Sequence, residues 1–203
     1  MKIICVGRNY VDHIHELANE KPTEPVLFLK PDSAILEKGK SFYLPKFSND
    51  IHHEIELVFR IGKVGKNIEA KFAHKYIDSY GIGIDFTARD VQSKLKEKGL
   101  PWEKAKAFDG SALVSDLKAF SEDLLASDIH FSLIKNGETV QNGHSGLMIW
   151  KLPALIEEIS KYFTLKTGDL IFTGTPAGVS AVKANDKLEG YLGEEKLFDL
   201  NIL

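Results

Sequence analysis

The stretch Ile51-His52-His53-Glu54-Ile55-Glu56-Leu57-Val58-Phe59 carries the strongest structural signal of this 203-residue chain, and it predicts a β-strand. Side chains alternate along a strand, so Glu54 and Glu56 share one face with His52, while the residues between them face a core. Two carboxylates this close repel unless a positive charge lies between them, and a divalent cation is the usual solution. On this stretch alone, the solvated face of a half-exposed strand is an equally good interpretation.

A third carboxylate ends a second predicted strand, Tyr80-Gly81-Ile82-Gly83-Ile84-Asp85. A carboxylate at a strand terminus is well placed to line a cleft. Together, Glu54, Glu56 and Asp85 would form an all-oxygen site, which favours Mg²⁺, Mn²⁺ or Ca²⁺ over zinc. Three carboxylates exceed the charge of one divalent ion, so a lysine is needed nearby to balance them, and Lys106 is the candidate.

The strand that ends at Asp85 is followed by a predicted helix over residues 88–98, with Thr87 as its N-cap and Asp90 in capping-box position. Glutamates alternate with lysines over residues 96–106, which is typical of a solvated helix face and loop. Three of the 26 basic residues are arginines, namely Arg8, Arg60 and Arg89. An arginine in a lysine-rich chain hints at a place where the planar, bidentate guanidinium is needed.

The composition is that of an ordinary soluble globular protein, with 43% hydrophobic and 27% charged residues. The net charge of −3 and the lack of a basic run argue against a nucleic-acid-binding surface. Cys5 is the single cysteine, so no disulfide framework exists and a reducing compartment is indicated. The N-terminal apolar run is too short to span a membrane. We therefore expect one domain over residues 1–203 in a cytoplasmic protein.

Short strands with turn signals between them dominate the rest of the chain. Helical periodicity appears near residues 10–19, 69–78, 88–98 and 152–163. Strands are expected over residues 26–30, 130–135, 138–141, 169–173, 187–191 and 195–202, with Asn136-Gly137 as a hairpin turn. Because helices and strands do not alternate regularly, the sequence predicts an α+β fold with a predominantly β core.

His13 and Glu16 lie three residues apart in the first predicted helix. At this spacing they share a face, so Glu16 could orient the imidazole and raise its basicity for activating water. A surface helical pair of little consequence is the alternative, and His15 is the competing histidine. The turn Thr173-Gly174-Thr175-Pro176-Ala177-Gly178 has hydroxyls and backbone N–H groups that could bind an anion, although a plain tight turn explains it equally.

Six motifs occur in a fixed order: Gly7-Arg8-Asn9-Tyr10-x-x-His13-x-x-Glu16, Leu29-Lys30-Pro31, His52-His53-Glu54-x-Glu56-Leu57, Asp85-x-Thr87-Ala88-Arg89-Asp90-x-Gln92, Lys106-x-Phe108-Asp109, and Gly168-Asp169-x-Ile171-x-Thr173-Gly174-Thr175-Pro176-x-Gly178-Val179. Over nearly the whole chain this series resembles the fumarylacetoacetate hydrolase family, and within it the short acylpyruvase and oxaloacetate decarboxylase type. The resemblance implies a mixed β-roll and a homodimer. It also implies Mg²⁺ or Mn²⁺, with Ca²⁺ as a substitute.

Carried over residue by residue, the resemblance implies Glu54, Glu56 and Asp85 as metal ligands. His13 and Glu16 would be a water-activating dyad on a mobile lid of about residues 10–24. The expected catalytic lysine is Lys106, and the residues expected to bind the oxo-acid are Arg8, Lys30, Arg89, Gln92 and Thr175.

These inferences predict an enzyme that breaks the C3–C4 bond of a pyruvate bearing an electron-withdrawing group at C3. Acylpyruvate hydrolysis and oxaloacetate decarboxylation would both pass through a pyruvate enolate that the metal stabilises as a Lewis acid. One alternative is isomerisation or hydrolysis of a longer dienedioate from aromatic degradation. Another is a non-catalytic oxo-acid-binding or Ca²⁺-binding protein. The expected ligand is a small oxo-acid, with neither nucleic acid nor membrane as a partner.

Overall fold

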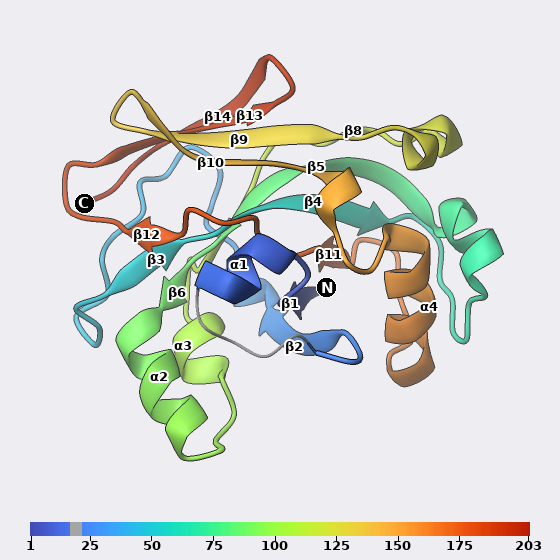
Figure 1. Ribbon diagram of the computed structural model, residues 1–203, viewed down its shortest axis with the longest axis horizontal. Helices are drawn as coiled ribbons and strands as arrows, with labels where there is room; N and C mark the ends of the chain where they lie inside the picture. The colour runs from blue at the N-terminus through green and yellow to red at the C-terminus, as the bar shows by residue number, and fades with distance from the viewer. Residues whose placement is uncertain (17–21) are drawn as a thin grey trace.

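The computed structural model describes residues 1–16 and 22–203, and in this part of the chain the strands form three sheets (Figure 1). The largest sheet contains β1 (Lys2–Gly7), β2 (Val26–Pro31), β4 (Ile55–Ile61), β5 (Ile77–Asp85), β7 (Ala112–Val114), β8 (Lys118–Ala119) and β11 (Leu170–Phe172). Its order is β2-β1-β11-β4-β5-β7, with β8 also paired to β5. β1 and β11 are parallel and the other neighbours antiparallel, so the sheet is mixed.

A second sheet has the order β10-β9-β13-β14 and packs against β4 and β5. Its strands are β9 (His130–Lys135), β10 (Glu138–His144), β13 (Lys187–Leu192) and β14 (Glu195–Asn201). The expected hairpin is confirmed, because Asn136 and Gly137 join β9 to β10 with φ angles of 53° and 86°. Two residues of positive φ give the tight turn whose twist matches the strands on either side. The predicted α+β fold with a predominantly β core is confirmed.

The stretch 51–59 proves to be two strands rather than the single strand predicted. β3 (Ile51–His53) belongs to a small third sheet between β12 (Ser180–Ala181) and β6 (Thr87–Ala88), and β4 begins only after a break at Glu54. Residues 53–59 are all buried, so neither face of this segment is solvated. The interpretation as an exposed strand face is therefore wrong, because the break carries the chain from one sheet into the next.

Helices cover both ends of the large sheet. The α-helices are α1 (Val11–Glu16), α2 (Arg89–Glu97), α3 (Glu103–Lys106) and α4 (Leu152–Tyr162), and the 3₁₀ helices are η1 (Asp32–Ala34), η2 (Ala70–Tyr76), η3 (Glu122–Ala126) and η4 (Ser145–Leu147). The helix expected near 69–78 is thus a 3₁₀ helix. α2 and α3 lie together near β6, whereas α4 packs against η2 (Figure 1). The helix expected over 10–19 and the lid expected over about 10–24 include residues 17–21, which lie outside the described residues.

The capping prediction for Thr87 is wrong. Thr87 lies in β6, where its backbone pairs with His52, and α2 begins at Arg89 without a side-chain cap. The Asp90 carboxylate instead accepts a hydrogen bond from the Ser48 hydroxyl at 2.6 Å. A capping signal is local, and here the pairing of β6 with β3 overrides it.

The main core lies between the large sheet and the four-stranded sheet and continues under α4. Its buried members include Leu57, Ile82, Ile84, Phe131, Leu133, Leu155, Ile156 and Ile159. This packing fixes β4 and β5 as a rigid floor. No helix in the described part of the chain has the length and apolar character needed to cross a membrane.

Candidate active site

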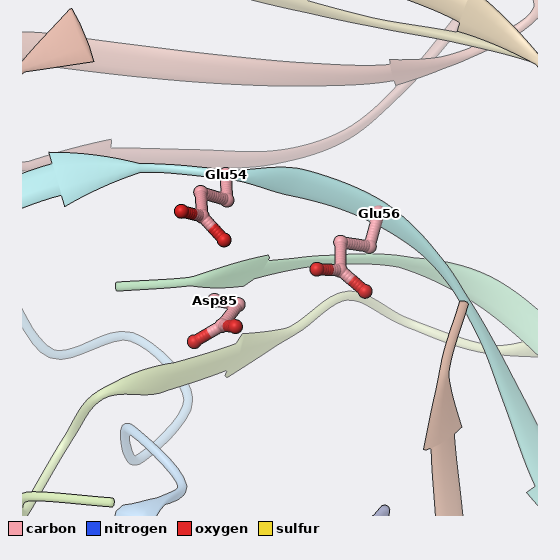
Figure 2. A group of neighbouring side chains, drawn as sticks. All are labelled: Glu54, Glu56 and Asp85. Carbon is pink, nitrogen blue, oxygen red and sulfur yellow. The ribbon is translucent and has the colours of Figure 1, made fainter. Parts of the chain in front are cut away.

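Three carboxylates meet where β4 begins and β5 ends. Glu54 lies in the break before β4, Glu56 belongs to β4, and Asp85 is the last residue of β5. Antiparallel pairing sets Ile55 opposite Ile84, and the Asp85 N–H donates to Glu54 O at 2.9 Å. One oxygen from each carboxylate lies within 4.8 Å of the other two, and all three residues are buried. Figure 2 shows Glu54 and Glu56 extending from one chain segment toward Asp85.

Cationic side chains lie directly against this acidic cluster. Lys106 Nζ, at the end of α3, donates to Glu54 Oε2 at 2.8 Å and to Asp85 Oδ2 at 2.7 Å. It also donates to the Thr87 hydroxyl at 2.6 Å, which explains why that hydroxyl does not cap α2. Arg89, the first residue of α2, forms an ion pair with Glu54. The structure thus places Lys106 where the charge of the carboxylates requires a cation.

Lys30, from β2, lies behind Asp85 and is completely buried. Its Nζ donates to Ser111 O at 3.0 Å, to Ser111 Oγ at 2.9 Å and to Lys106 O. The ammonium is 2.8 Å from Asp85 Oδ1 but outside hydrogen-bonding geometry, so this oxygen has no donor among the described residues. Lys30 does not line the cavity over the carboxylates, and its expected place near the bound oxo-acid stays a prediction.

The two glutamates differ in their electrostatic surroundings. Burial raises the pKa of Glu54, but Lys106 and Arg89 outweigh this effect and hold that pKa well below its ordinary value. Burial raises the pKa of Glu56 well above its ordinary value, and the negative charges of Asp85 and Glu54 raise it further. Among the residues that the structure describes, Glu56 is therefore the carboxylate of the three without a compensating cation.

This set of groups fits a hard divalent cation. Three carboxylates supply only oxygen ligands, which Mg²⁺, Mn²⁺ and Ca²⁺ prefer. Asp85 Oδ1 is buried without a hydrogen-bond donor, and the ion pairs formed within residues 1–16 and 22–203 do not include Glu56. A cation between the carboxylates would turn the repulsion at Glu56 into attraction. Glu54, Glu56 and Asp85 could therefore hold a metal ion.

His13 and Glu16, in α1, come together beside the carboxylates. His13 Nδ1 lies 3.3 Å from Glu16 Oε2, and the Glu16 carboxylate accepts the Gly178 N–H at 3.1 and 3.2 Å. His13 is only 6% exposed, which does not fit the alternative of a surface pair. Burial lowers the pKa of His13 although Glu54 and Glu16 act in the opposite direction, so the ring is neutral near pH 7. The His15 side chain lies outside what the structure describes.

Arg8 enters the site from the loop after β1 with a left-handed backbone, at a φ of 59°. Such a conformation is uncommon for a residue with a side chain and needs support from its surroundings. The neighbouring Asn9 supplies it, because its amide donates to Thr173 O at 2.8 Å and to Trp150 O at 3.1 Å, and its Oδ1 accepts the Trp150 N–H at 2.8 Å. The loop is thereby tied to the strand and turn that flank Glu56.

A cavity opens over the carboxylates. Six further residues that the sequence singled out line it together with them: Arg8, His13, Arg89, Gln92, Lys106 and Thr175. Sequence reasoning missed three other lining residues: Phe28, Lys96 and Trp102. The aromatic Trp102 next to a helix end was an available signal, whereas Lys96 looked like part of a solvated face.

Gln141, in β10, is a further residue that sequence reasoning missed. Its Nε2 donates to the Thr175 hydroxyl at 2.8 Å and to Pro176 O at 3.0 Å. Its Oε1 accepts the Ile55 N–H at 3.1 Å and a hydrogen bond from His53 Nδ1 at 2.9 Å. All four hydrogen-bonding positions of this buried amide are used. Gln141 therefore joins the four-stranded sheet to both the glutamate segment and the 173–178 turn.

This chain is similar to known proteins in both sequence and structure. Residues 2–198 match the fumarylacetoacetate (FAA) hydrolase C-terminal family. The mitochondrial oxaloacetate tautomerase of Homo sapiens is 43% identical over 190 residues, covering 92% of this chain and 85% of that protein. The oxaloacetate tautomerase of Escherichia coli strain K12 is 42% identical over 190 residues, covering 92% and 86% respectively.

The crystal structure of fumarylpyruvate hydrolase from Pseudomonas aeruginosa, in complex with Mn²⁺ and pyruvate, has a similar fold. It superimposes with a TM-score of 0.93 at 34% sequence identity, covering 100% of this chain and 89% of that one. The similarity thus extends over nearly the whole chain in sequence and in fold alike.

Proposed function

This chain belongs to the fumarylacetoacetate hydrolase family, and on that premise we propose that it is a divalent-metal-dependent enzyme that enolises C3-substituted pyruvates. One observation carries the proposal: a single cavity joins the three-carboxylate cluster to a lysine held in its charged form and to a neutral histidine. Enolisation needs an electrophilic centre, a stabiliser of negative charge and a proton acceptor, and these groups can supply all three.

Glu54, Glu56 and Asp85 would hold the metal, with Mg²⁺ or Mn²⁺ expected and Ca²⁺ as a substitute. When bound, the cation would supply Lewis-acid polarisation of the substrate's oxo group and neutralise part of its negative charge. The presence of Mn²⁺ in the similar fumarylpyruvate hydrolase supports a divalent metal.

Lys106 is expected to stabilise the negative charge that develops on the substrate. Burial opposes its charge, but Asp85 and Glu54 more than compensate and raise its pKa, so the ammonium keeps its proton. Lys106 can therefore donate hydrogen bonds but cannot act as the base. Arg89 donates to Gln92 Oε1 at 2.7 Å, and this pair on the first turn of α2 would orient the substrate carboxylate.

His13 is expected to accept the proton. With Nδ1–H directed at Glu16, the lone pair of the neutral ring lies on Nε2, which is free to take a proton. In the tautomerisation of oxaloacetate, Nε2 would remove a proton from C3, and the protonated ring would then return it to the oxo oxygen. In acylpyruvate hydrolysis, Nε2 would remove a proton from the water that attacks C4.

Oxaloacetate tautomerisation is the first candidate reaction, because two relatives that match 92% of this chain are oxaloacetate tautomerases. Cleavage of the C3–C4 bond is the second, and the similarity to fumarylpyruvate hydrolase favours it. The two differ in whether His13 acts on C3 or on water. We also propose a homodimer, which light scattering after size-exclusion chromatography would test by giving twice the mass of the chain.

A small substrate panel tests the proposed function. Oxaloacetate, acetylpyruvate and fumarylpyruvate would be followed by ultraviolet absorbance with Mg²⁺, Mn²⁺, Ca²⁺ or a chelator, and the rate with metal alone would be subtracted. We expect turnover of at least one substrate that disappears with the chelator and in Glu56→Gln. Absorbance changes no faster than the metal background for all three substrates would favour a non-catalytic binding protein and contradict the proposal.

A further inference from the structure

The half-buried lining residues Arg8, Phe28, Lys96 and Trp102 form the outer part of the cavity, which we call its mouth. They are a second group of cationic and aromatic residues, apart from the carboxylate cluster. Lys96, on the last turn of α2, lies with its Nζ 5.4 Å from the centre of the Trp102 ring. The Trp102 ring is 6.0 Å from the Phe28 ring, and Lys106 Nζ lies 5.1 Å from the centre of Phe28. Two stacked lysine–aromatic pairs thus lead from the floor of the cavity to its mouth.

Within residues 1–16 and 22–203, no carboxylate pairs with the positive charges at this mouth. Lys96 is half-buried in the cavity wall, and its pKa is lowered to about 8 by burial and then by the positive charges of Arg8, Arg89 and Lys106. The ion pairs found in residues 1–16 and 22–203 include neither Lys96 nor Arg8. Desolvated like charges without a carboxylate between them are unfavourable for folding and are typical of a site that awaits an anion.

The floor, in contrast, has as many cations as carboxylates. Glu54 and Asp85 pair with Lys30, Lys106 and Arg89, and Glu56 lies beside them. A divalent ion at the floor adds two positive charges, which a substrate with one carboxylate cannot balance. A second carboxylate, reaching outward from the floor, would meet the uncompensated cations at the mouth.

We infer that Lys96, supported by Trp102 and Arg8, forms a subsite for the distal carboxylate of the substrate, so that the enzyme selects oxo-dicarboxylates over oxo-monocarboxylates. This inference rests on the proposed function, in which the oxo-acid end of the substrate occupies the floor. The rings of Phe28 and Trp102 lie between the two ends and supply an apolar surface for the carbon chain that joins the carboxylates. The Lys96 ammonium, placed over the outer ring, supplies the charge.

Fumarylpyruvate and acetylpyruvate form a matched pair for testing this subsite. Both are acylpyruvates cleaved by the same reaction, but only fumarylpyruvate has a distal carboxylate. For Lys96→Met we expect kcat/KM for fumarylpyruvate to fall about tenfold, mainly through KM, because one charge-assisted contact is lost. The acetylpyruvate value should stay within about twofold. Lys96→Arg should restore most of the loss, since the charge is kept.

Lys94→Met is the matched control, because Lys94 lies on the same helix but is exposed and does not line the cavity. Lys94→Met should leave kcat/KM for both substrates unchanged. Equal losses for both substrates in Lys96→Met, or no loss for either, would overturn the subsite. If the wild-type protein turns over neither substrate, acylpyruvate cleavage is excluded, and the proposed function as a whole fails if oxaloacetate is not turned over either. The subsite is then tested by calorimetric binding of the two compounds to the Mn²⁺-loaded protein. Lys96→Met should bind fumarylpyruvate more weakly than the wild-type protein does, and acetylpyruvate equally well.

Discussion

At the floor of the cavity each cationic group lies against a carboxylate, whereas at the mouth Lys96 and Arg8 have no such partner among the residues that the structure describes. The floor is built from β4, β5 and the ends of α2 and α3, which are fixed by a common core. The mouth consists of one helix end, one loop and two aromatic rings. The charges at the floor are therefore arranged before a ligand binds, whereas the positive charges at the mouth would be neutralised only by a bound anion.

The largest effect is expected at the floor, where Glu54 and Glu56 can be compared directly. Glu56→Gln removes the uncompensated charge and keeps an oxygen that can accept the Gly174 N–H, now 2.7 Å from Glu56. Metal binding and turnover should fall roughly 1,000-fold, but stability should be unchanged or higher because like-charge repulsion is relieved. Manganese binding by electron paramagnetic resonance and urea denaturation measure the two properties.

Glu54→Gln is the contrasting variant, because Glu54 is paired with both Lys106 and Arg89. Breaking a buried pair leaves charges uncompensated, so this variant should lose about 3–5 kcal/mol of stability as well as metal binding. Equal stability losses in the two variants would show that the glutamates are not electrostatically different. The comparison between a paired and an unpaired carboxylate would then be wrong.

His13→Ala should have the next largest effect, and it separates the dyad from the floor. Acylpyruvate hydrolysis should fall roughly 10²–10⁴-fold, equivalent to about 3–5 kcal/mol of barrier, because no base would activate water. Manganese affinity should be kept, since the three carboxylates are untouched. Oxaloacetate decarboxylation should suffer less, because loss of CO₂ needs no water. Equal losses in both reactions at saturating metal would assign His13 another role, such as protonating the enolate.

The carboxylates could be predicted from the sequence because their spacing is local and their chemistry is specific. Glu54 and Glu56 were found by assuming one continuous strand, and Asp85 by its place at a strand end. The strand assumption was wrong at Glu54, yet the three residues still converge because β4 pairs with β5. The family resemblance covered the same residues, and the family and the mixed β fold that it implied are confirmed.

The residues that were missed have roles that only tertiary contacts create. Lys96 lies in a run of alternating lysines and glutamates, and nothing in that run shows which side faces Trp102. Gln141 is one polar residue in a hairpin strand, and its role depends on contacts with residues more than 30 positions away. Thr87 had a good local capping pattern that strand pairing overrode. Local patterns therefore identified the three carboxylates, but not the residues whose roles depend on contacts with distant parts of the chain.

Gln141→Leu should show how far the floor depends on support from the neighbouring sheet. The substitution keeps the approximate size of the side chain but removes its bonds to Ile55 and Thr175. We expect metal affinity or turnover to fall about 10-fold to 100-fold, as for other residues that orient metal ligands. Asn142→Leu is the control, because Asn142 is exposed on the same strand. A Gln141→Leu variant that is less stable but binds and turns over normally would reduce Gln141 to a structural residue.

The smallest effect is expected at the mouth, where it appears as a dependence on pH. The groups that set the pKa of Lys96 are the cations Arg8, Arg89 and Lys106, which lower it with burial, and Glu54, which raises it. Since that pKa is lowered to about 8, Lys96 is charged below this pH and loses its charge as the pH rises through it. The kcat/KM for fumarylpyruvate should therefore fall by up to about tenfold above pH 8, because this ratio reports ionisations of the free enzyme.

The corresponding ratio for acetylpyruvate should lack this fall, since no distal carboxylate senses Lys96. In Lys96→Arg the fall for fumarylpyruvate should disappear, because a guanidinium stays charged over this range. Dividing the pH profile of kcat/KM for one substrate by that for the other cancels the ionisations at the floor, because these affect both substrates equally. A ratio that is flat from about pH 6 to 9 in the wild-type protein would contradict a lowered pKa at Lys96. If Lys96→Met also left the preference for fumarylpyruvate unchanged, Arg8 would be the residue at the mouth that contacts the distal carboxylate.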